Sequence, residues 1–285
     1  MFRSLIFVPG NSARFVEKAK TLHADIVCFD LEDSVPATEK LSARKIIAET
    51  LSRRQEYSAQ VYVRTNSLES GLLLEDLRAA ARKGIDGIVV PKVSDANETL
   101  EIIKQVAMVE AEKRIEMTVM PSIETAKGVI NAYNIANTDD RINALIFGVF
   151  DFLYDMRLDY DERDASGYAY ARAKIPVDAR AAGVDAIDAI WQKIDDVKGL
   201  VNDATIAKRL GYSGKCIIHP GQIDPVHKVF HPTKSEIEWA RKVVVALGEA
   251  MEKGSGKGAV RLDGRMVDAV HYKQAKAILE AAKED

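Results

Sequence analysis

Eight short apolar runs, separated by segments with helical spacing, constrain the fold of this sequence more than any other feature. They lie at residues 5–9, 25–33, 60–66, 87–92, 117–124, 144–151, 184–190 and 215–220. Strands that alternate with amphipathic helices form parallel β-α-β units, and near-continuous apolar strands fit a sheet covered on both faces. Eight such units predict an α/β fold, a closed (β/α)8 TIM barrel, with a doubly wound open sheet as the alternative.

The chain changes character after Pro220. Pro225 and Pro232 interrupt the pattern, and a helix is expected over residues 235–251. A glycine-rich stretch at 253–258 reads as a flexible linker before a last helix over about 268–283. We therefore predict a barrel at residues 1–225 and a C-terminal helical extension at 226–285 that serves as a lid, with the active site of the barrel at the carboxyl ends of its strands.

Charge, hydropathy and cysteine content exclude several classes of protein. The net charge of -3 and the pI near 6.0 argue against a general affinity for nucleic acid. Because there is no run of about 18 apolar residues and no signal-peptide pattern, we expect neither a membrane span nor a secreted protein. Cys28 and Cys216 each lie in an apolar run, so we expect buried free thiols and a cytoplasmic location.

Charged residues end most of the apolar runs, and in a (β/α)8 barrel the carboxyl ends of the strands carry the active site. These strand-end residues are Glu32, Asp33, Arg64, Lys92, Glu124, Asp151 and His219. A single charge in such a place is usually solvated. Similar endings on six of eight runs, all on one rim, favour a site instead.

Two carboxylates without clustered cysteine or histidine indicate a cation that prefers oxygen ligands. Glu124 and Asp151 end adjacent strands and could share one Mg²⁺, completed by water and substrate oxygens. Gly148 allows the backbone to approach a ligand closely. Arg64 adds a fixed cation that suits a carboxylate or a developing oxyanion. Together they predict a site for an anionic, oxygen-rich substrate.

The histidines give weaker signals. His219 precedes a proline at a strand end, where a hydrogen-bonded packing role is as good an interpretation as a catalytic base. His227 and His231 have i,i+4 spacing, but the neighbouring prolines disfavour the helix that a zinc site would need there.

In its ordered set of motifs the sequence resembles the citrate lyase β-subunit-like family, which includes citramalyl-CoA and malyl-CoA lyases of the HpcH/HpaI aldolase superfamily. The matching segments are 3–11, 14–19, 30–36, 39–40, 43–44, 63–66, 90–92, 123–125, 147–151, 183–188, 214–215, 218–222, 230–233 and 263–268. The resemblance implies a Mg²⁺-dependent carbon–carbon lyase. Such an enzyme cleaves or forms a 3-hydroxyacyl thioester, with an acyl thioester and a 2-oxo acid on the other side of the reaction.

The resemblance also implies roles for residues. Glu124 and Asp151 would bind magnesium, and Arg64 would stabilise the thioester enolate. Asp268 would transfer a proton, reaching the site of a neighbouring subunit in a homotrimer or hexamer. The family usually has a proline two residues after this aspartate, whereas this chain has Val270.

Further positions match residues around the metal and the carrier. Asp33 corresponds to an acidic position close to the metal that acts through water, and Glu32 is a second candidate for that role. Arg3, Arg14 and Lys18 correspond to positions near the pantetheine or nucleotide end of coenzyme A.

Several alternatives stay open at this point. The substrate can be a citryl, citramalyl or malyl thioester, carried by coenzyme A or by an acyl carrier protein, and hydrolysis of the thioester can follow. One competing function is a Mg²⁺-dependent 2-keto-acid aldolase that uses no thioester. Another is a non-catalytic homologue that binds coenzyme A or serves as a subunit.

Overall fold

The computed structural model describes residues 2–161, 164–252 and 259–282. The chain divides into two compact units, Met1–His227 and Lys228–Asp285. The first contains a closed barrel, and the second is built mainly from two helices and a two-stranded sheet. Among the described helices, none has the length and apolar character needed to cross a membrane.

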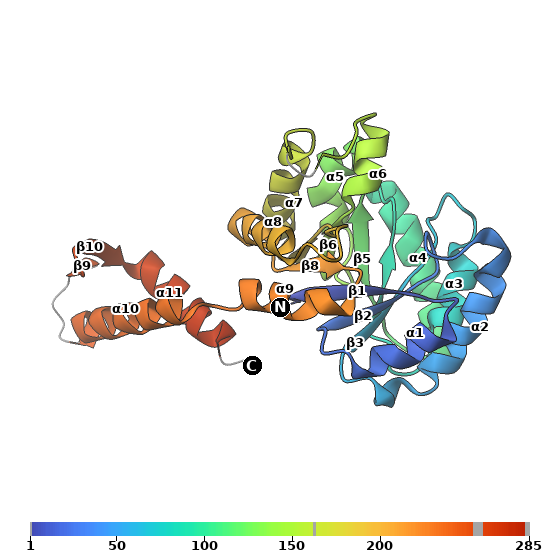
Figure 1. The fold of residues 1–285 in the computed structure, drawn as a ribbon, viewed down its shortest axis with the longest axis horizontal. Coiled ribbons are helices and arrows are strands. Elements are labelled where there is room, and N and C mark those ends of the chain that lie inside the picture. Colours follow the sequence, from blue (N-terminus) through green and yellow to red (C-terminus); the bar gives the residue numbers. More distant parts are fainter. Residues whose placement is uncertain (1, 162–163, 253–258, 283–285) are drawn as a thin grey trace. The chain divides into compact units, whose positions relative to one another are not determined.

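Eight parallel strands close the barrel in sequence order, and β1 pairs with both β2 and β8. The strands are β1 (Ser4–Pro9), β2 (Ile26–Asp30), β3 (Gln60–Arg64), β4 (Gly87–Val90), β5 (Thr118–Ile123), β6 (Ala144–Phe147), β7 (Asp185–Asp188) and β8 (Gly214–Ile217). Figure 1 shows the helices of this unit around the outside of the strands. The predicted (β/α)8 TIM barrel is confirmed, and the open-sheet alternative is wrong.

Helices connect the successive strands. The α-helices of this unit are α1 (Ala13–Lys18), α2 (Lys40–Leu51), α3 (Leu73–Ala80), α4 (Ala96–Lys113), α5 (Ala126–Ala136), α6 (Val149–Asp155), α7 (Ala169–Ala182) and α8 (Val197–Leu210), and α9 (Ile223–Phe230) follows β8. Short 3-10 helices lie at η1 (Ala19–Thr21), η2 (Ala37–Glu39), η3 (Arg54–Glu56) and η4 (Pro220–Gln222).

Side chains in the loops fix where these helices begin and end. Asp95 and Thr125 accept hydrogen bonds from main-chain amides of the first turns of α4 and α5. Gly183 and Gly211 end α7 and α8 with φ of 79° and 104°, the left-handed conformation that glycine adopts most readily. Pro225 lies in the first turn of α9, where a proline is tolerated, so it does not break the chain as expected.

Apolar side chains fill the interior of the barrel. The buried cluster there is formed by Leu5, Ile26, Cys28, Tyr62, Val89, Met120, Ala144, Ile146, Ile187 and Cys216. Cys28 and Cys216 are free and buried, as the sequence predicts. A packed interior leaves the ends of the strands as the place for a ligand.

A buried ionic cluster joins β7 and β8 to the helices α7 and α8. Nζ of Lys215 lies 2.6 Å from Oδ2 of Asp188 and 2.5 Å from Oδ2 of Asp203. The guanidinium of Arg172 donates to both carboxylate oxygens of Asp188, at 2.9 and 2.7 Å. Since each cation contacts both carboxylates, the four charges compensate one another within the cluster.

The second unit packs α10 (Lys234–Glu252) and α11 (Ala269–Ala281) with an antiparallel hairpin of β9 (Ala259–Leu262) and β10 (Arg265–Asp268). Its core is formed by Ala240, Val243, Leu247, Val267 and Ala275. Asp263 and Gly264 turn the hairpin with φ of 47° and 80°, which suits a two-residue turn with positive φ at both positions. This hairpin was not predicted, and the predicted linker at 253–258 lies outside the described residues.

Candidate active site

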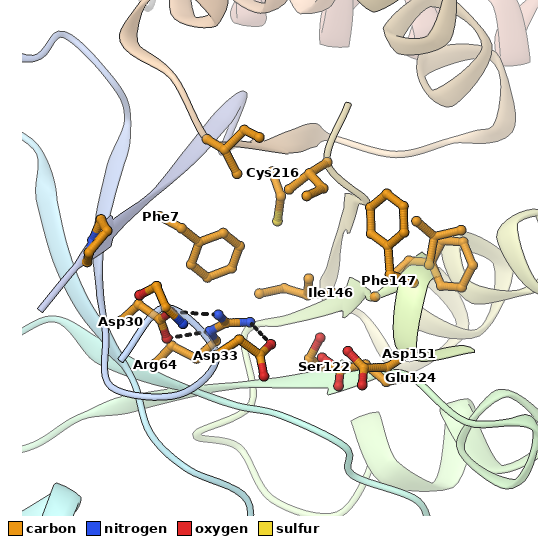
Figure 2. Close-up of a pocket in the computed structure, with 17 residues that line it drawn as sticks. Phe7, Asp30, Asp33, Arg64, Ser122, Glu124, Ile146, Phe147, Asp151 and Cys216 are labelled. Atoms are coloured by element: carbon orange, nitrogen blue, oxygen red, sulfur yellow. Dashed lines mark hydrogen bonds and ion pairs between the residues drawn. The ribbon is translucent and has the colours of Figure 1, made fainter. Parts of the chain in front are cut away.

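A pocket of about 460 Å³ lies at the carboxyl ends of the barrel strands. It is lined by Phe7, Pro9, Asp30, Asp33, Ser34, Arg64, Ser122, Glu124, Ile146, Phe147, Gly148, Val149, Phe150, Asp151, Ile190, Cys216 and Ile218. Figure 2 shows charged side chains along one side of it, from Arg64 through Asp33 to Glu124 and Asp151. Apolar side chains, among them Phe7 and Cys216, form the other side.

Arg64 ends β3 and is held from two directions. Its Nε and Nη2 donate to the two carboxylate oxygens of Asp30, at 2.7 Å each. Its guanidinium lies over the ring of Phe7, 4.6 Å from the centroid, and Nη1 is 3.3 Å from Glu32 and 3.4 Å from Asp33. The burial of Arg64 opposes its charge, but the facing carboxylates outweigh burial and raise its pKa. Arg64 is therefore a permanent, oriented cation at the pocket.

Asp30 organises this part of the site and was missed by the sequence analysis as a site residue. It is 1% exposed, and its carboxylate also accepts hydrogen bonds from the amides of Glu32 at 2.9 Å and Ser34 at 3.0 Å. Burial opposes its charge, but Arg64 and these bonds together hold the pKa of Asp30 below its ordinary value. The signal that could have found it is its position at the end of a strand that pairs with the strand of Arg64.

Glu124 and Asp151 lie together on one wall (Figure 2). Glu124 directly follows β5, as predicted. The sixth strand is shorter than predicted, ending at Phe147, and Asp151 lies in the first turn of α6. A Cβ on Gly148 would lie 2.4 Å from Cγ of Glu124, so the close approach expected at this glycine is made to the side chain of Glu124.

Burial controls the charge of Glu124, which is 4% exposed. Burial, followed by the nearby charge of Glu32, raises the pKa of Glu124 to about 8. Among the described residues, no hydrogen-bond partner satisfies Oε2 of Glu124 or Oε2 of Glu32, although both atoms are buried. Oε2 of Glu32 still faces Nη1 of Arg64 at 3.3 Å. Oε2 of Glu124 has no such cation among the described residues, so it is a site where a metal ion, or water bound to one, would be stabilised.

Lys92 is a second cation at the site, and it is one of the strand-end charges for which the sequence predicted no individual role. It follows β4 with φ of 59°. This left-handed backbone conformation costs a residue other than glycine roughly 1–2 kcal/mol of conformational free energy. Nζ lies 2.7 Å from Glu32, 3.5 Å from Asp151 and 3.9 Å from Asp33. Partial burial opposes its charge, but the hydrogen bond to Glu32 and the other carboxylates raise the pKa of Lys92.

The donor set fits a divalent cation. In the described part of the chain, the cations Arg64 and Lys92 face five carboxylates, those of Asp30, Glu32, Asp33, Glu124 and Asp151. No group of three or more histidine, cysteine, aspartate or glutamate residues is arranged there to enclose a metal ion. Magnesium suits such a site because one or two protein carboxylates hold it, with water and substrate oxygens as the other ligands.

The structure does not bring every predicted site residue to the pocket. Arg3 precedes β1, at the amino ends of the strands, and its Nε and Nη2 donate to Asp25 at 3.2 Å each. The predicted contact between Arg3 and the carrier does not fit this position, because the pocket lies at the opposite end of the barrel. Arg14 and Lys18 lie one turn apart on exposed positions of α1, the helix that follows β1.

Asp268 lies in the second unit, where it caps α11. Its Oδ1 accepts hydrogen bonds from the amides of Val270 at 3.0 Å and His271 at 3.3 Å, and lies 2.7 Å from Nδ1 of His271. The hydrogen bond with His271 lowers the pKa of Asp268. A helix therefore starts directly after this aspartate, although the chain has Val270 where the family usually has a proline.

His219 and His227 make hydrogen bonds away from the charged side of the pocket. Nδ1 of His219 accepts a hydrogen bond from the amide of Gly221 at 3.1 Å, which caps η4. Nε2 of His227 lies 2.7 Å from Oγ of Ser4, at the amino end of the barrel. The side chain of His219 is exposed, so the structure shows its hydrogen bond but not the expected packing.

Comparisons with known proteins were made for both sequence and structure. Residues 3–220 match the family model described as HpcH/HpaI aldolase/citrate lyase. The citrate lyase subunit beta of Leuconostoc mesenteroides subsp. cremoris is 36% identical, over 98% of this chain and 93% of the relative. The mitochondrial citramalyl-CoA lyase of Rattus norvegicus is 32% identical, over 98% of this chain and 86% of the relative.

A solved structure also matches over nearly the whole chain. The protein CitE from Mycobacterium tuberculosis, in complex with magnesium, acetoacetate and coenzyme A, superposes with a TM-score of 0.81 at 28% identity. The match covers 99% of this chain and 98% of that one. Similarity of this extent includes the pocket and the second unit.

Proposed function

Because the chain belongs to the HpcH/HpaI aldolase/citrate lyase family, we propose that it is a magnesium-dependent carbon–carbon lyase. Its substrate would be a 3-hydroxyacyl thioester of the citryl, citramalyl or malyl type. The products would be an acyl thioester and a 2-oxo acid, and the reverse condensation would use the same site. The observation that carries this proposal is one pocket in which Glu124 and Asp151 share a wall and Arg64 lies along the same charged side.

Glu124 and Asp151 are the residues that would hold magnesium, with Asp33 and Glu32 nearby to bind its water ligands. When bound, the ion would polarise the substrate oxygens and favour loss of the hydroxyl proton. Gly148 supports this by leaving room for the side chain of Glu124, since any larger residue would displace it. The buried Oε2 of Glu124, which no donor among the described residues satisfies, supports the assignment.

Arg64 would stabilise the enolate oxygen of the departing acyl thioester. Negative charge develops on that oxygen as the carbon–carbon bond breaks, and an oriented cation stabilises it most at that point. Asp30 prevents the guanidinium from turning to follow the substrate. The apolar side of the pocket, which includes Phe7, Ile190 and Ile218, would exclude water from the enolate.

Asp268 would transfer the proton at the carbon next to the thioester carbonyl, as base in condensation and as acid in cleavage. The family resemblance supports this role and its action on the site of a neighbouring subunit. With Oδ1 engaged in the helix cap, Oδ2 is the oxygen that remains for the reaction. The lowered pKa of Asp268 suits the ionised form that a base requires.

Coenzyme A is the proposed carrier, and an acyl carrier protein is the alternative. Arg14 and Lys18 would bind its phosphates, since both are exposed on the helix after β1. The similar CitE structure contains coenzyme A, which favours this carrier. We further propose a homotrimer or hexamer located in the cytoplasm, with a second unit that covers a neighbouring site.

The test is a panel assay with magnesium. Citryl-, citramalyl- and malyl-CoA would be supplied in turn, with separate detection of oxaloacetate, pyruvate and glyoxylate. We expect one 2-oxo acid to be released, with loss of activity after chelation and in Glu124→Gln. Cleavage of free 2-keto-acid aldols without any thioester would support the aldolase alternative, and binding of coenzyme A without turnover would support the non-catalytic one.

A further inference from the structure

Lys92 has a backbone conformation that its side chain disfavours. It lies two residues beyond the end of β4, with φ of 59°. Glycine adopts this conformation freely, whereas a lysine there persists only where the surrounding contacts compensate. The contacts of the Lys92 side chain must therefore stabilise this conformation, and they indicate its role.

The ammonium of Lys92 binds three carboxylates at once. Nζ donates to Oε1 of Glu32 at 2.7 Å and also lies near Asp151, at 3.5 Å, and Asp33, at 3.9 Å. Glu32 is nearly buried, so this bond compensates a charge that water cannot reach. The side chain of Lys92 is 36% exposed, so its ammonium can move toward solvent.

Asp151 depends on Lys92 more than the other two carboxylates do. Glu32 and Asp33 also have Arg64 within 3.3 and 3.4 Å. Within the described ranges, Lys92 provides the single ion pair made by Asp151. The ammonium of Lys92 therefore pairs with the same carboxylate that the proposed function assigns to a metal ion.

We propose that Lys92 is a positioning residue that stands in for the divalent cation. It holds Asp151 while the metal is absent, and its ammonium leaves this carboxylate when the metal binds. It stays on Glu32, which keeps that acidic side chain in place beside the metal. Lys92 thereby weakens metal binding and keeps the metal-free site assembled. This inference rests on the proposed function, because it takes Asp151 as a metal ligand.

The test measures metal binding without substrate. Mn²⁺ would be titrated, with detection by electron paramagnetic resonance, into the wild-type protein, Lys92→Met, Lys92→Gly and Lys92→Arg. Lys104→Met is the matched control, because Lys104 is 74% exposed and pairs with Glu101 of the same helix, far in sequence from the pocket residues. Lys92→Gly removes the charge and the backbone strain together, so it keeps the inference testable if the methionine variant does not fold.

We expect the dissociation constant of Mn²⁺ to fall by about tenfold in Lys92→Met and Lys92→Gly, because a competing charge within 4 Å is lost. Lys92→Arg and Lys104→Met should stay close to the wild type. Unchanged or weaker binding in both neutral variants overturns the inference and leaves the proposed function intact. A wild-type protein that binds neither Mn²⁺ nor Mg²⁺ overturns both, whereas absence of lyase activity with normal metal binding counts against the proposed function alone.

Discussion

Asp30 and Arg64 are register partners on the adjacent strands β2 and β3, and two hydrogen bonds of 2.7 Å join their side chains. The pairing fixes the plane of the guanidinium with respect to the barrel. A cation that is already oriented needs no rearrangement when charge develops on the substrate. The relationship thus connects strand register to the proposed stabilisation of the enolate.

We expect Asp30→Asn to lower kcat by about tenfold to a hundredfold, because Arg64 keeps its charge but loses its orientation. Stability should fall by about 3 kcal/mol or less, since Glu32 and Asp33 still compensate the guanidinium. Steady-state kinetics and urea unfolding check both effects. The control is Asp25→Asn, which breaks the pair with Arg3 at the other end of the barrel and should leave kcat unchanged. Equal loss of kcat in both variants would contradict the assigned role.

The raised pKa of Glu124 predicts how the stability of the metal-free protein depends on pH. Its pKa of about 8 in the folded state is above the ordinary value of 4.5. The folded state thus retains a proton that the unfolded state has lost, so its contribution to stability is present below about pH 4.5 and is lost as the pH rises through about 8. Thermal unfolding in chelator between pH 5 and pH 9 should show this decline.

In the variant Glu124→Gln the decline should be reduced, because the amide does not ionise. The gain over the wild type should be near zero at pH 5 and reach a few kcal/mol, on the order expected for a buried carboxyl, near pH 9. Identical pH profiles for the two proteins would show that Glu124 does not titrate in this range.

Gly148→Ala should weaken metal binding without unfolding the barrel. The new Cβ would lie 2.4 Å from Cγ and 2.9 Å from Cδ of Glu124, so the carboxylate has to leave its place. Mn²⁺ titration should show a loss in affinity of at least tenfold, in the range for disturbed metal ligands. Gly248→Ala is the control, because its Cβ would meet no atom within 4 Å and helix propensity favours it. Normal metal affinity in Gly148→Ala would remove the support for Glu124 as a ligand.

Asp268→Asn should keep the fold and metal affinity but lose exchange of the proton next to the thioester carbonyl. The amide oxygen still caps α11, whereas the group no longer accepts a proton from carbon. Proton NMR of acetyl-CoA in deuterium oxide measures this exchange directly. Asp263→Asn, in the turn of the same hairpin, is the control and should exchange normally. Retained exchange in Asp268→Asn would exclude Asp268 as the transferring group.

Lys215→Met should destabilise the barrel by about 3–5 kcal/mol, because Asp188 and Asp203 then lose one of their two buried cations and keep only Arg172 among the described residues. Urea unfolding measures the change, with Lys104→Met as the exposed control, for which we expect less than about 0.5 kcal/mol. A small effect at Lys215 would mean that Arg172 alone compensates both carboxylates.

The sequence predicts the barrel because its signal is local: apolar strands and amphipathic helices alternate regardless of which strands become neighbours. It also predicts Arg64, Glu124 and Gly148 near one pocket, because each stands at the carboxyl end of an apolar run. Asp151 reaches the same pocket from the first turn of a helix, which a run of apolar letters does not distinguish from a strand.

Pairings between charges are what the sequence leaves open. Asp30 belongs with Arg64 because of the register between two strands, and Lys92 reaches Asp151 because of one unusual φ angle. Neither is visible in the spacing of residues along one chain. Arg3 shows the converse error, since a residue inside a matching motif lies at the wrong end of its strand for the role that the motif implied.

Both native thiols are buried, and this makes the protein suitable for site-directed labelling. Burial raises the pKa of Cys28 well above its ordinary value and that of Cys216 to about 12, so neither forms the thiolate that maleimides attack. A fluorophore would then attach only to a cysteine placed by design, for instance Val270→Cys, where the native side chain is 60% exposed beside Asp268. Its emission would report in solution whether thioester binding changes the surroundings of the second unit.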